Sequence, residues 1–329
     1  MNVRRAAGPE ARLLAGIDIG GTKIGIAIGD SSGRVIASDR IENDSARTPE
    51  AVLTEALERL QMLCKQESLL APRALGLACP GPLSYEGGCL LEVPNMPLWQ
   101  GFGVLAFCRD ATGLPVAMMN DANAGVLAEA RWGAARGTKS AIFLTMSTGM
   151  GAGLWLDGRV YEGPSALAGE IGHIRLSDDG PVGFGKHGSV EGYLSGPGIE
   201  QVAQAERLAF VQAGRATKLP AMDLTPRVVC DLARAGDEAA LATIDRCGAK
   251  LGQLCALLVD LLNPEVIVVG TIGSAYPDLW FPRARAVLER EAILSAQENL
   301  RLEVSGLSDR GNQTALAIAD RHATALQSG

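Results

Sequence analysis

Two short segments combine glycines with hydroxyl and charged residues in a pattern suited to binding phosphate. The first reads DIGGTK (18–23) and the second reads STGMGAG (147–153). Glycines permit tight backbone dihedrals and bring N–H groups close to an anion. Thr22 adds a hydroxyl donor, Lys23 a cation, and Asp18 a carboxylate able to hold Mg²⁺ through water. A plain hairpin turn would explain either segment alone, but the repetition favours phosphate binding.

A third glycine-rich stretch, GPVGFGKHGSVEGYLSG (180–196), nearly spells the phosphate-binding pattern G-x-x-x-x-G-K-[ST]. Gly180, Gly185 and Lys186 match, but His187 stands where a hydroxyl must hold Mg²⁺. The preceding run HIRLSDD is a poor buried strand, and a P-loop follows such a strand. We therefore do not predict a P-loop here; the remnant of a metal site and an ordinary turn remain as alternatives.

The elements that position these segments alternate between strands and helices. LLAGIDIGGTKIGIAIGD (13–30) reads as two strands around a glycine turn, and a third strand, RVIASDR, follows. Thr48 and Pro49 predict the start of a helix, and Gly113 the end of another. ALGLACPG and LPVAMMND read as further strands, and ANAGVLAEARWGA as a helix.

A second round of the same elements begins at residue 140. SAIFLTMSTGMGAGLWLDGRV (140–160) again reads as strand, glycine turn and strand, with Asp157-Gly158 as a hairpin signal. Helices are predicted near 195–212, 237–262, 278–293 and 313–326, and strands at EVIVVG and RLEVSG. This alternation predicts an α/β fold. Two rounds, each opened by a glycine-turn hairpin, predict a duplicated architecture of two lobes around a central cleft.

Composition excludes several classes of function. The chain has 329 residues, a formal charge of −7 and a pI near 5.2, which argues against nucleic acid or an anionic membrane as the main partner. Seven scattered cysteines without CxC or CxxC spacing indicate core packing in a reducing cytoplasm. The longest apolar run (251–270) is interrupted by Asp260, Asn263 and Pro264, so it predicts a buried helix and a strand. The first dozen residues lack the apolar core of a signal peptide.

The order of the motifs resembles that of a known family. DIGGTK, CPGPLSYEGGCLLEVPNMPLW, NDANA, STGMGAG, EIGH, EGYLSG and NPEVIVVG follow one another as in the ROK family of sugar kinases and repressors. That resemblance covers residues 13–325 and implies an actin-like (ribonuclease H-like) ATPase fold that binds ATP and Mg²⁺. It also implies a flexible tail (1–12), an N-terminal lobe (13–121 with 310–329) and a C-terminal lobe (122–309).

The resemblance assigns roles to individual residues. Asp121 in NDANA matches the family's catalytic base, which accepts the proton of a sugar hydroxyl as it attacks the γ-phosphate. Read without the family, Asn-Asp after a strand is more typical of a helix N-cap, and a Glu and a His three apart of a solvated helix face. The expected substrate-binding residues are Asn95, Asn120, Glu170, His173 and Glu191. Those expected to bind ATP are Asp18, Gly20, Gly21, Thr22, Lys23, Thr148, Gly149, Gly151 and Gly270.

Two segments depart from the family's pattern. The family commonly has C-x-C-G-x-x-G-C-L-E after EIGH, with three cysteines that join the histidine around a structural zinc. Here the matching positions are Val182, Phe184 and Ser189, and one histidine cannot form a tetrahedral zinc site. We expect no zinc, and packing by Val182 and Phe184 in its place. After Gly270, Thr271 and Ile272 stand where the family commonly has further glycines.

The predicted function is an ATP-dependent hexose kinase with glucose as the first expected substrate. N-acetylmannosamine, N-acetylglucosamine, fructose and allose stay open, as does a degenerate protein that binds sugar or nucleotide without catalysis. A ROK-type repressor is disfavoured, because only 17 residues precede Asp18, too few for a DNA-binding domain. The resemblance further implies a homodimer, and the composition predicts a cytoplasmic protein without a nucleic-acid or membrane partner.

Overall fold

The computed structural model describes residues 12–91, 93 and 96–328, which form two compact units. Unit 1 contains the described residues of Met1–Gly137, together with Glu162–Leu167 and Gly306–Gly329. Unit 2 contains Thr138–Tyr161 and Ala168–Ser305. Each unit is built on its own five-stranded sheet, and each is described by itself below.

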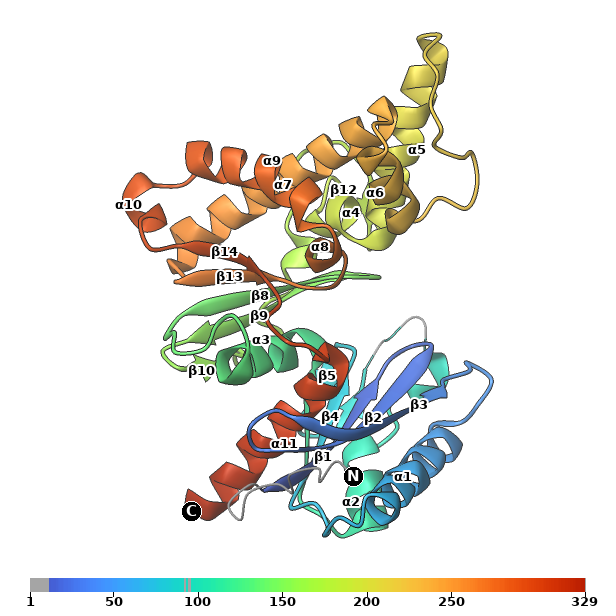
Figure 1. Ribbon diagram of the computed structural model, residues 1–329, viewed down its shortest axis with the longest axis vertical. Coiled ribbons are helices and arrows are strands. Elements are labelled where there is room, and N and C mark those ends of the chain that lie inside the picture. The colour runs from blue at the N-terminus through green and yellow to red at the C-terminus, as the bar shows by residue number, and fades with distance from the viewer. Residues whose placement is uncertain (1–11, 92, 94–95, 329) are drawn as a thin grey trace, which may run out of the picture. The chain divides into compact units, whose positions relative to one another are not determined.

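The sheet of unit 1 has the strand order β3-β2-β1-β4-β7, and Figure 1 labels the first four of these strands. The first three strands are antiparallel, whereas β4 and β7 run parallel to β1. The predicted glycine turn joins β1 to β2. The strands are β1 (Leu13–Ile19), β2 (Lys23–Asp30), β3 (Val35–Glu42), β4 (Leu75–Cys79) and β7 (Val116–Asn120), with a small hairpin of β5 (Leu83–Ser84) and β6 (Cys89–Leu90) beside them.

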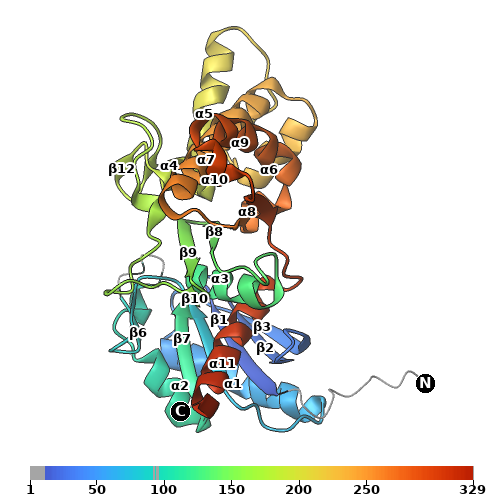
Figure 2. The same cartoon turned by 90° about the vertical axis from the view of Figure 1, so that its left-hand side faces the viewer.

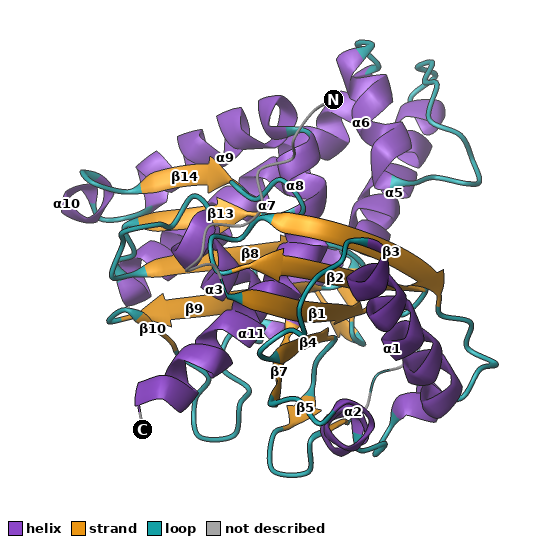
Figure 3. Ribbon diagram, turned by 60° about the horizontal axis from the view of Figure 1, so that its bottom comes forward, coloured by secondary structure: helices purple, strands orange, loops and turns teal. Residues whose placement is uncertain are grey.

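Helices cover both faces of this sheet (Figure 3). On one face, isoleucines of β1 and β2 pack with residues of α1 and α2, and the N-cap of α1 is Thr48 as predicted. On the other face, α11 lies across β1 and β4. The helices are α1 (Pro49–Gln66), η1 (Pro97–Trp99), α2 (Val104–Thr112), α3 (Asp121–Trp132) and α11 (Arg310–Ser328).

The sheet of unit 2 repeats the arrangement of the first, in the order β10-β9-β8-β13-β14. Again the hairpin strands are antiparallel and the last two strands run parallel to β8. The predicted turn at Asp157-Gly158 has both residues at positive φ, as a two-residue hairpin requires. The strands are β8 (Ala141–Met146), β9 (Met150–Leu156), β10 (Arg159–Val160), β13 (Val266–Val269) and β14 (Arg301–Val304).

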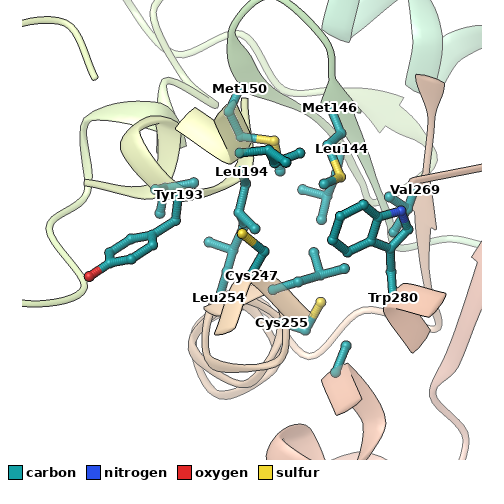
Figure 4. Packing of buried hydrophobic residues seen from close by; sticks show 14 of the residues in the cluster. Leu144, Met146, Met150, Tyr193, Leu194, Cys247, Leu254, Cys255, Val269 and Trp280 are labelled. Atoms are coloured by element: carbon teal, nitrogen blue, oxygen red, sulfur yellow. The ribbon is translucent and has the colours of Figure 1, made fainter. Parts of the chain in front are cut away.

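A long central helix organises the core of unit 2. Cys247, Leu254 and Cys255 of α7 are buried with Trp280 of α9 and strand residues of β8 and β13 (Figure 4). Burial raises the pKa of both thiols to about 12, which agrees with their predicted packing role. The helices are η2 (Ile171–His173), α4 (Val190–Leu194), α5 (Gly196–Gln212), α6 (Pro226–Arg234), α7 (Glu238–Leu262), α8 (Thr271–Ala275), α9 (Pro277–Glu291) and α10 (Leu294–Gln297); a hairpin of β11 (Val182–Gly183) and β12 (Lys186–His187) precedes α4.

The structure differs from the sequence prediction at the boundary between the units. We predicted that the C-terminal lobe begins at residue 122, but α3 belongs to unit 1 because it packs against α11 and β7. Glu129 of α3 contributes to this attachment, since its Oε2 accepts hydrogen bonds from the N–H groups of Ala134 (2.7 Å) and Gly306 (3.2 Å).

Further outcomes concern the terminal helix, the helix α6 and the predicted tail. The terminal helix starts at Arg310, three residues before the predicted start, and α6 was not predicted. Of the predicted tail, only Arg12 lies within the described residues. None of the described helices has the length and apolar character needed to cross a membrane.

Candidate functional site

Asp18 lies near the end of β1, in a row with Gly25 of β2 and Arg40 of β3. The strand registers pair Asp18 with Gly25 and Gly25 with Arg40. A side chain at Gly25 would crowd this row, because a Cβ there would lie 3.2 Å from Asn312 Oδ1 and 3.5 Å from Asp18 Cβ. The glycine therefore leaves space beside the carboxylate of Asp18.

The carboxyl of Asp18 has an unusual protonation equilibrium. Burial, and secondarily the charge of Asp121, raise its pKa from 3.8 to about 7, although Arg310 and Arg40 oppose the shift. A buried carboxylate with this pKa would gain from a nearby cation. Asp18, which we predicted to hold Mg²⁺, thus has a negative charge that its surroundings compensate poorly.

The N-terminus of α11 adds residues that the sequence analysis missed. Gly311 approaches Asp18 so closely that a Cβ would lie 2.7 Å from its Oδ2. Asn312 Nδ2 donates to Asp309 Oδ2 at 2.8 Å, which fixes both side chains at the start of the helix. A pocket of about 330 Å³ is lined here by Gly25, Ser38, Asp39, Arg40, Asp309 and Asn312. These residues at the N-terminus of α11 were not predicted, because the helix was expected to start near residue 313.

Arg310, in the first turn of α11, is a second cation near Asp18, in addition to Arg40. Burial lowers its pKa, while the charges of Asp18, Glu129 and Asp121 act to raise it. Arg310 therefore carries its charge close to the two carboxylates for which the sequence predicted chemistry. No local pattern in the sequence predicted a functional role for Arg310, because a lone arginine after Asp is typical of a solvated loop.

The turn between β1 and β2 is held by one side chain. Asn43 Nδ2 donates to Gly20 O at 2.7 Å, and the N–H of Asn43 donates to Thr22 O at 2.8 Å. Within the turn, Gly20 N–H donates to Lys23 O at 3.0 Å. Lys23 Nζ lies 3.9 Å from a carboxylate oxygen of Glu42, in an exposed pair that constrains the lysine little.

Asn120 and Asp121 occupy the junction of β7 and α3. Asn120 is the N-cap of α3, since its Oδ1 accepts from Asn123 N–H at 2.8 Å. The structural interpretation of this asparagine is therefore correct, and its Nδ2 is the part of the amide that the cap does not use. Asp121 is exposed in the first helical turn, where an anion is favoured.

In unit 2, Glu191 joins the second glycine turn to α4. Its Oε2 accepts from Met150 N–H at 3.2 Å, and a Cβ on Gly149 would lie 2.9 Å from the same oxygen. A Cβ on Gly172 would lie 3.5 Å from it. The STGMGAG turn, the EIGH segment and Glu191 therefore meet at one place in this unit. Thr148 and Gly151 lie in and beside that turn, with Gly151 on β9.

Glu170 caps the short helix η2, His173 is its last residue, and both residues are exposed. The ring of His173 lies 5.0 Å from the ring of Phe184, centroid to centroid, at 63°. Lys186 Nζ donates to the backbone oxygen of His173 at 2.8 Å. The stretch between 180 and 189 is thus a hairpin that contacts the EIGH histidine, and the P-loop alternative does not apply.

Gly270 connects β13 to α8, whose first residue is Thr271. Gly270 N–H donates to Leu144 O at 2.9 Å, which places the turn beside β8. Thr271 has a φ of 48°, a left-handed conformation that is rare and costly for a β-branched residue. Thr271 thus has a backbone conformation that suits glycine, and glycine is the residue that the resemblance leads us to expect there.

A sequence comparison decides the family. The profile of the ROK family matches residues 14–321, which is nearly the whole chain. The chain belongs to the ROK family. This membership agrees with the order of motifs and with the two sheets of matching topology.

Among ROK relatives, kinases and repressors are both similar to this chain. The glucokinase of Halalkalibacterium halodurans is 32% identical over 79% of this chain and 80% of its own. The xylose repressor of Caldicellulosiruptor bescii is 27% identical over 90% of this chain and 75% of its own. A Streptomyces griseus ROK glucokinase solved with glucose and AMPPNP has a TM-score of 0.78 at 25% identity, covering 94% of this chain and 99% of that one. The fold is thus the actin-like ATPase fold.

The zinc centre implied by the ROK resemblance does not fit the residues present. Val182 and Phe184 have no ligand atoms, and Ser189 Oγ is engaged with Gly192 N–H at 3.1 Å as the cap of α4. In the described part of the chain, no group of three or more His, Cys, Asp or Glu residues is placed to hold a metal. The expected apolar packing is also wrong in part, since Phe184 is 66% and Val182 36% exposed.

The remaining predicted residue of this ROK chain is Asn95. It lies outside the described residues, so its role stays a prediction from the resemblance.

Proposed function

We propose that the protein is an ATP-dependent sugar kinase that transfers the γ-phosphoryl group to a hydroxyl of a hexose, with glucose as the first expected substrate. The observation that carries this proposal is the cluster in unit 1 of Asp18, Asp121 and Arg310 beside a glycine turn. It agrees with membership of a family whose similar members include glucokinases.

In this proposal Asp121 is the general base. It lies where β7 ends and α3 begins, so its backbone is fixed on both sides by regular structure. An exposed carboxylate can accept the proton of an incoming hydroxyl, which contributes roughly 10²–10⁴ in rate. Asn120, whose Oδ1 is committed to the helix cap, would offer its Nδ2 to a sugar oxygen.

Unit 1 also suits a metal-bound triphosphate. The mostly buried carboxylate of Asp18, with its pKa raised to about 7, would be relieved by a divalent cation held directly or through water. Mg²⁺ would supply charge neutralisation to the phosphates. Gly20, Gly21 and Thr22, fixed by Asn43, would direct backbone and hydroxyl donors at phosphate oxygens.

Unit 2 contributes the remaining proposed ligands. Glu170 and His173 are exposed and would bind ring hydroxyls of the sugar. Glu191 holds the second glycine turn through Met150 and would keep one carboxylate oxygen for the sugar. Thr148, Gly149, Gly151 and Gly270 would contact the nucleotide. The proposal is supported by the similar glucokinase that was solved with glucose and AMPPNP.

A sugar-responsive repressor is the second candidate, because the similar xylose repressor matches 90% of this chain. Asp121 favours the kinase, since a protein that only binds sugar has no need of a general base. An electrophoretic shift assay with genomic DNA fragments at moderate salt separates the two. Sequence-specific binding released by a sugar would support the repressor.

The substrate is identified by ADP formation from Mg-ATP across glucose, fructose, allose, N-acetylmannosamine and N-acetylglucosamine. We expect turnover with at least one of these sugars. Sugar or ATP binding without turnover would indicate the degenerate protein instead.

We further propose that the protein is cytoplasmic and forms a homodimer. Five of the seven cysteines are buried in the cores, and all seven are free thiols in the structure. Size-exclusion chromatography with light scattering measures the oligomeric state.

A further inference from the structure

The hairpin formed by β11 and β12 lies directly on the helix that carries Glu191 (Figure 2). A Cβ on Gly183 would lie 2.4 Å from Gly192 N, and a Cβ on Gly192 would lie 2.4 Å from Pro181 O. Both residues must therefore be glycine for the two backbones to meet. This contact couples the position of the hairpin to the first turn of α4.

A single side chain of α5 holds the hairpin strand β11. Gln201 Oε1 accepts from Val182 N–H at 2.9 Å, and Gln201 Nε2 donates to Val182 O at 2.9 Å. The amide thereby satisfies both backbone groups of one residue, as a neighbouring strand would. Ser189 Oγ adds a longer bond to Gly183 O at 3.4 Å.

At its tip, the hairpin contacts His173 in two ways. Phe184 presents its ring to the imidazole, and Lys186 donates to the backbone oxygen of the same histidine. Phe184 has a φ of 52°, which is unfavourable for a bulky side chain, and most of its ring faces solvent. Neither core packing nor turn geometry accounts for a phenylalanine here, whereas the contact with His173 does.

We propose that Gln201 and Phe184 are positioning residues that orient His173 without a metal. Gln201 fixes β11, the hairpin carries Phe184, and the ring of Phe184 sets the tilt of the imidazole. The amide clamp and the aromatic contact take the place of the zinc centre whose ligands are absent from the described residues. The consequence for sugar affinity rests on the proposed function, but the orientation of His173 does not.

Histidine-selective NMR tests the orientation independently of activity. The chain has three histidines, so combining His187→Gln with His322→Gln leaves His173 as the single imidazole signal. In that background, Phe184→Ala removes the ring next to His173, and Gln201→Ala removes the clamp. Gln201→Glu keeps an acceptor for Val182 N–H but loses the donor to its oxygen. Gln204→Ala, at an exposed glutamine of the same helix, is the matched control.

We expect Phe184→Ala to move the His173 ring signals, Gln201→Ala to move them in the same direction, and Gln204→Ala to leave them in place. In otherwise wild-type protein, Gln201→Ala should raise KM for the sugar about three- to tenfold, as the loss of one or two hydrogen bonds implies, with little change in kcat. Gln201→Glu should have at least as large an effect, because its second carboxylate oxygen would lie against the carbonyl oxygen of Val182.

An unchanged His173 signal in Gln201→Ala would overturn the proposal, whatever the activity. A shifted signal with unchanged sugar KM would also overturn it, since the clamp would then not serve the substrate. If the wild type phosphorylates no sugar, the proposed function fails, and the NMR result alone decides whether Gln201 orients His173.

Discussion

At the scale of single residues, Asp18 is the carboxyl of the candidate site whose ionised form is most clearly disfavoured in the folded protein. Its carboxyl is removed from water near Asp121, and the cations Arg310 and Arg40 compensate only in part. Such an arrangement is typical of sites that bind a cation or transfer a proton. The cost should be visible in the stability of the protein as a function of pH.

We predict that Asp18→Asn stabilises the protein in neutral and alkaline solution. In the unfolded chain Asp18 ionises near pH 3.8, but in the folded protein it ionises only near pH 7. The wild type therefore loses stability as pH rises from about 4 to about 7, and the amide does not. The difference should grow from near zero at pH 4 to on the order of 2–4 kcal/mol at pH 8.

Urea unfolding of both proteins at several pH values measures this difference. Asp110→Asn, at an exposed carboxylate of α2, is the control and should show no such growth. A constant difference between Asp18→Asn and wild type across this range would contradict the account.

Thr271 gives a second prediction at this scale. Its φ of 48° costs a β-branched residue about 1–3 kcal/mol, a strain that glycine does not experience. Thr271→Gly should therefore stabilise the protein by about 0.5–1.5 kcal/mol after the greater chain entropy of glycine is subtracted. Thermal unfolding measures the change, and a destabilised variant would show that the threonine side chain contributes more than its backbone costs.

At the scale of elements, close packing of α11 on the sheet positions the site residues at its N-terminus. A Cβ on Gly76 of β4 would lie 2.0 Å from Ala315 O and 2.6 Å from Ala319 N. Both atoms belong to the helix backbone and cannot move without displacing Arg310 and Asn312. The distance between helix and sheet is therefore set by a glycine in the strand.

Gly76→Ala should lower the free energy of unfolding by about 1–3 kcal/mol or more, because the methyl group overpacks this interface. Gly103→Ala is the matched control, since the nearest atom to its Cβ is 4.0 Å away and its φ is −74°. Denaturant unfolding of both variants tests the claim. Equal stability of the two would mean that α11 can move away from the sheet at little cost.

The same helix shows what could be predicted from the sequence. Periodicity and turn signals were sufficient for α1, β8, β9 and the end of α2 at Gly113, because those signals are local. The start of α11 was missed because no serine or threonine cap marks it; instead, Gln313 Oε1 accepts from the N–H of Asp309. Residues that gather through tertiary packing, such as Asn43, Arg310 and Gln201, left no local pattern.

At the scale of the whole molecule, the two sheets have the same order of antiparallel and parallel strands. Each of the two units contains part of the residues that the proposed function requires. Unit 1 contains the candidate base, the carboxylate for a cation and Asn120, and unit 2 contains the candidate sugar ligands Glu170, His173 and Glu191. The motif order in the sequence anticipated this duplication. The departure at the zinc positions was also visible in the sequence, but the hydrogen-bonded clamp of Gln201 was not.

The central claim is that Asp121 acts as the base of a sugar kinase. The most direct measurement is sugar-dependent ADP formation by the wild type and by Asp121→Asn, with the sugar affinity of both measured by calorimetry. We predict that the variant binds sugar with similar affinity but loses about 10²–10⁴ in kcat. Turnover by the variant at the wild-type rate, or no sugar-dependent turnover by the wild type, would contradict the account.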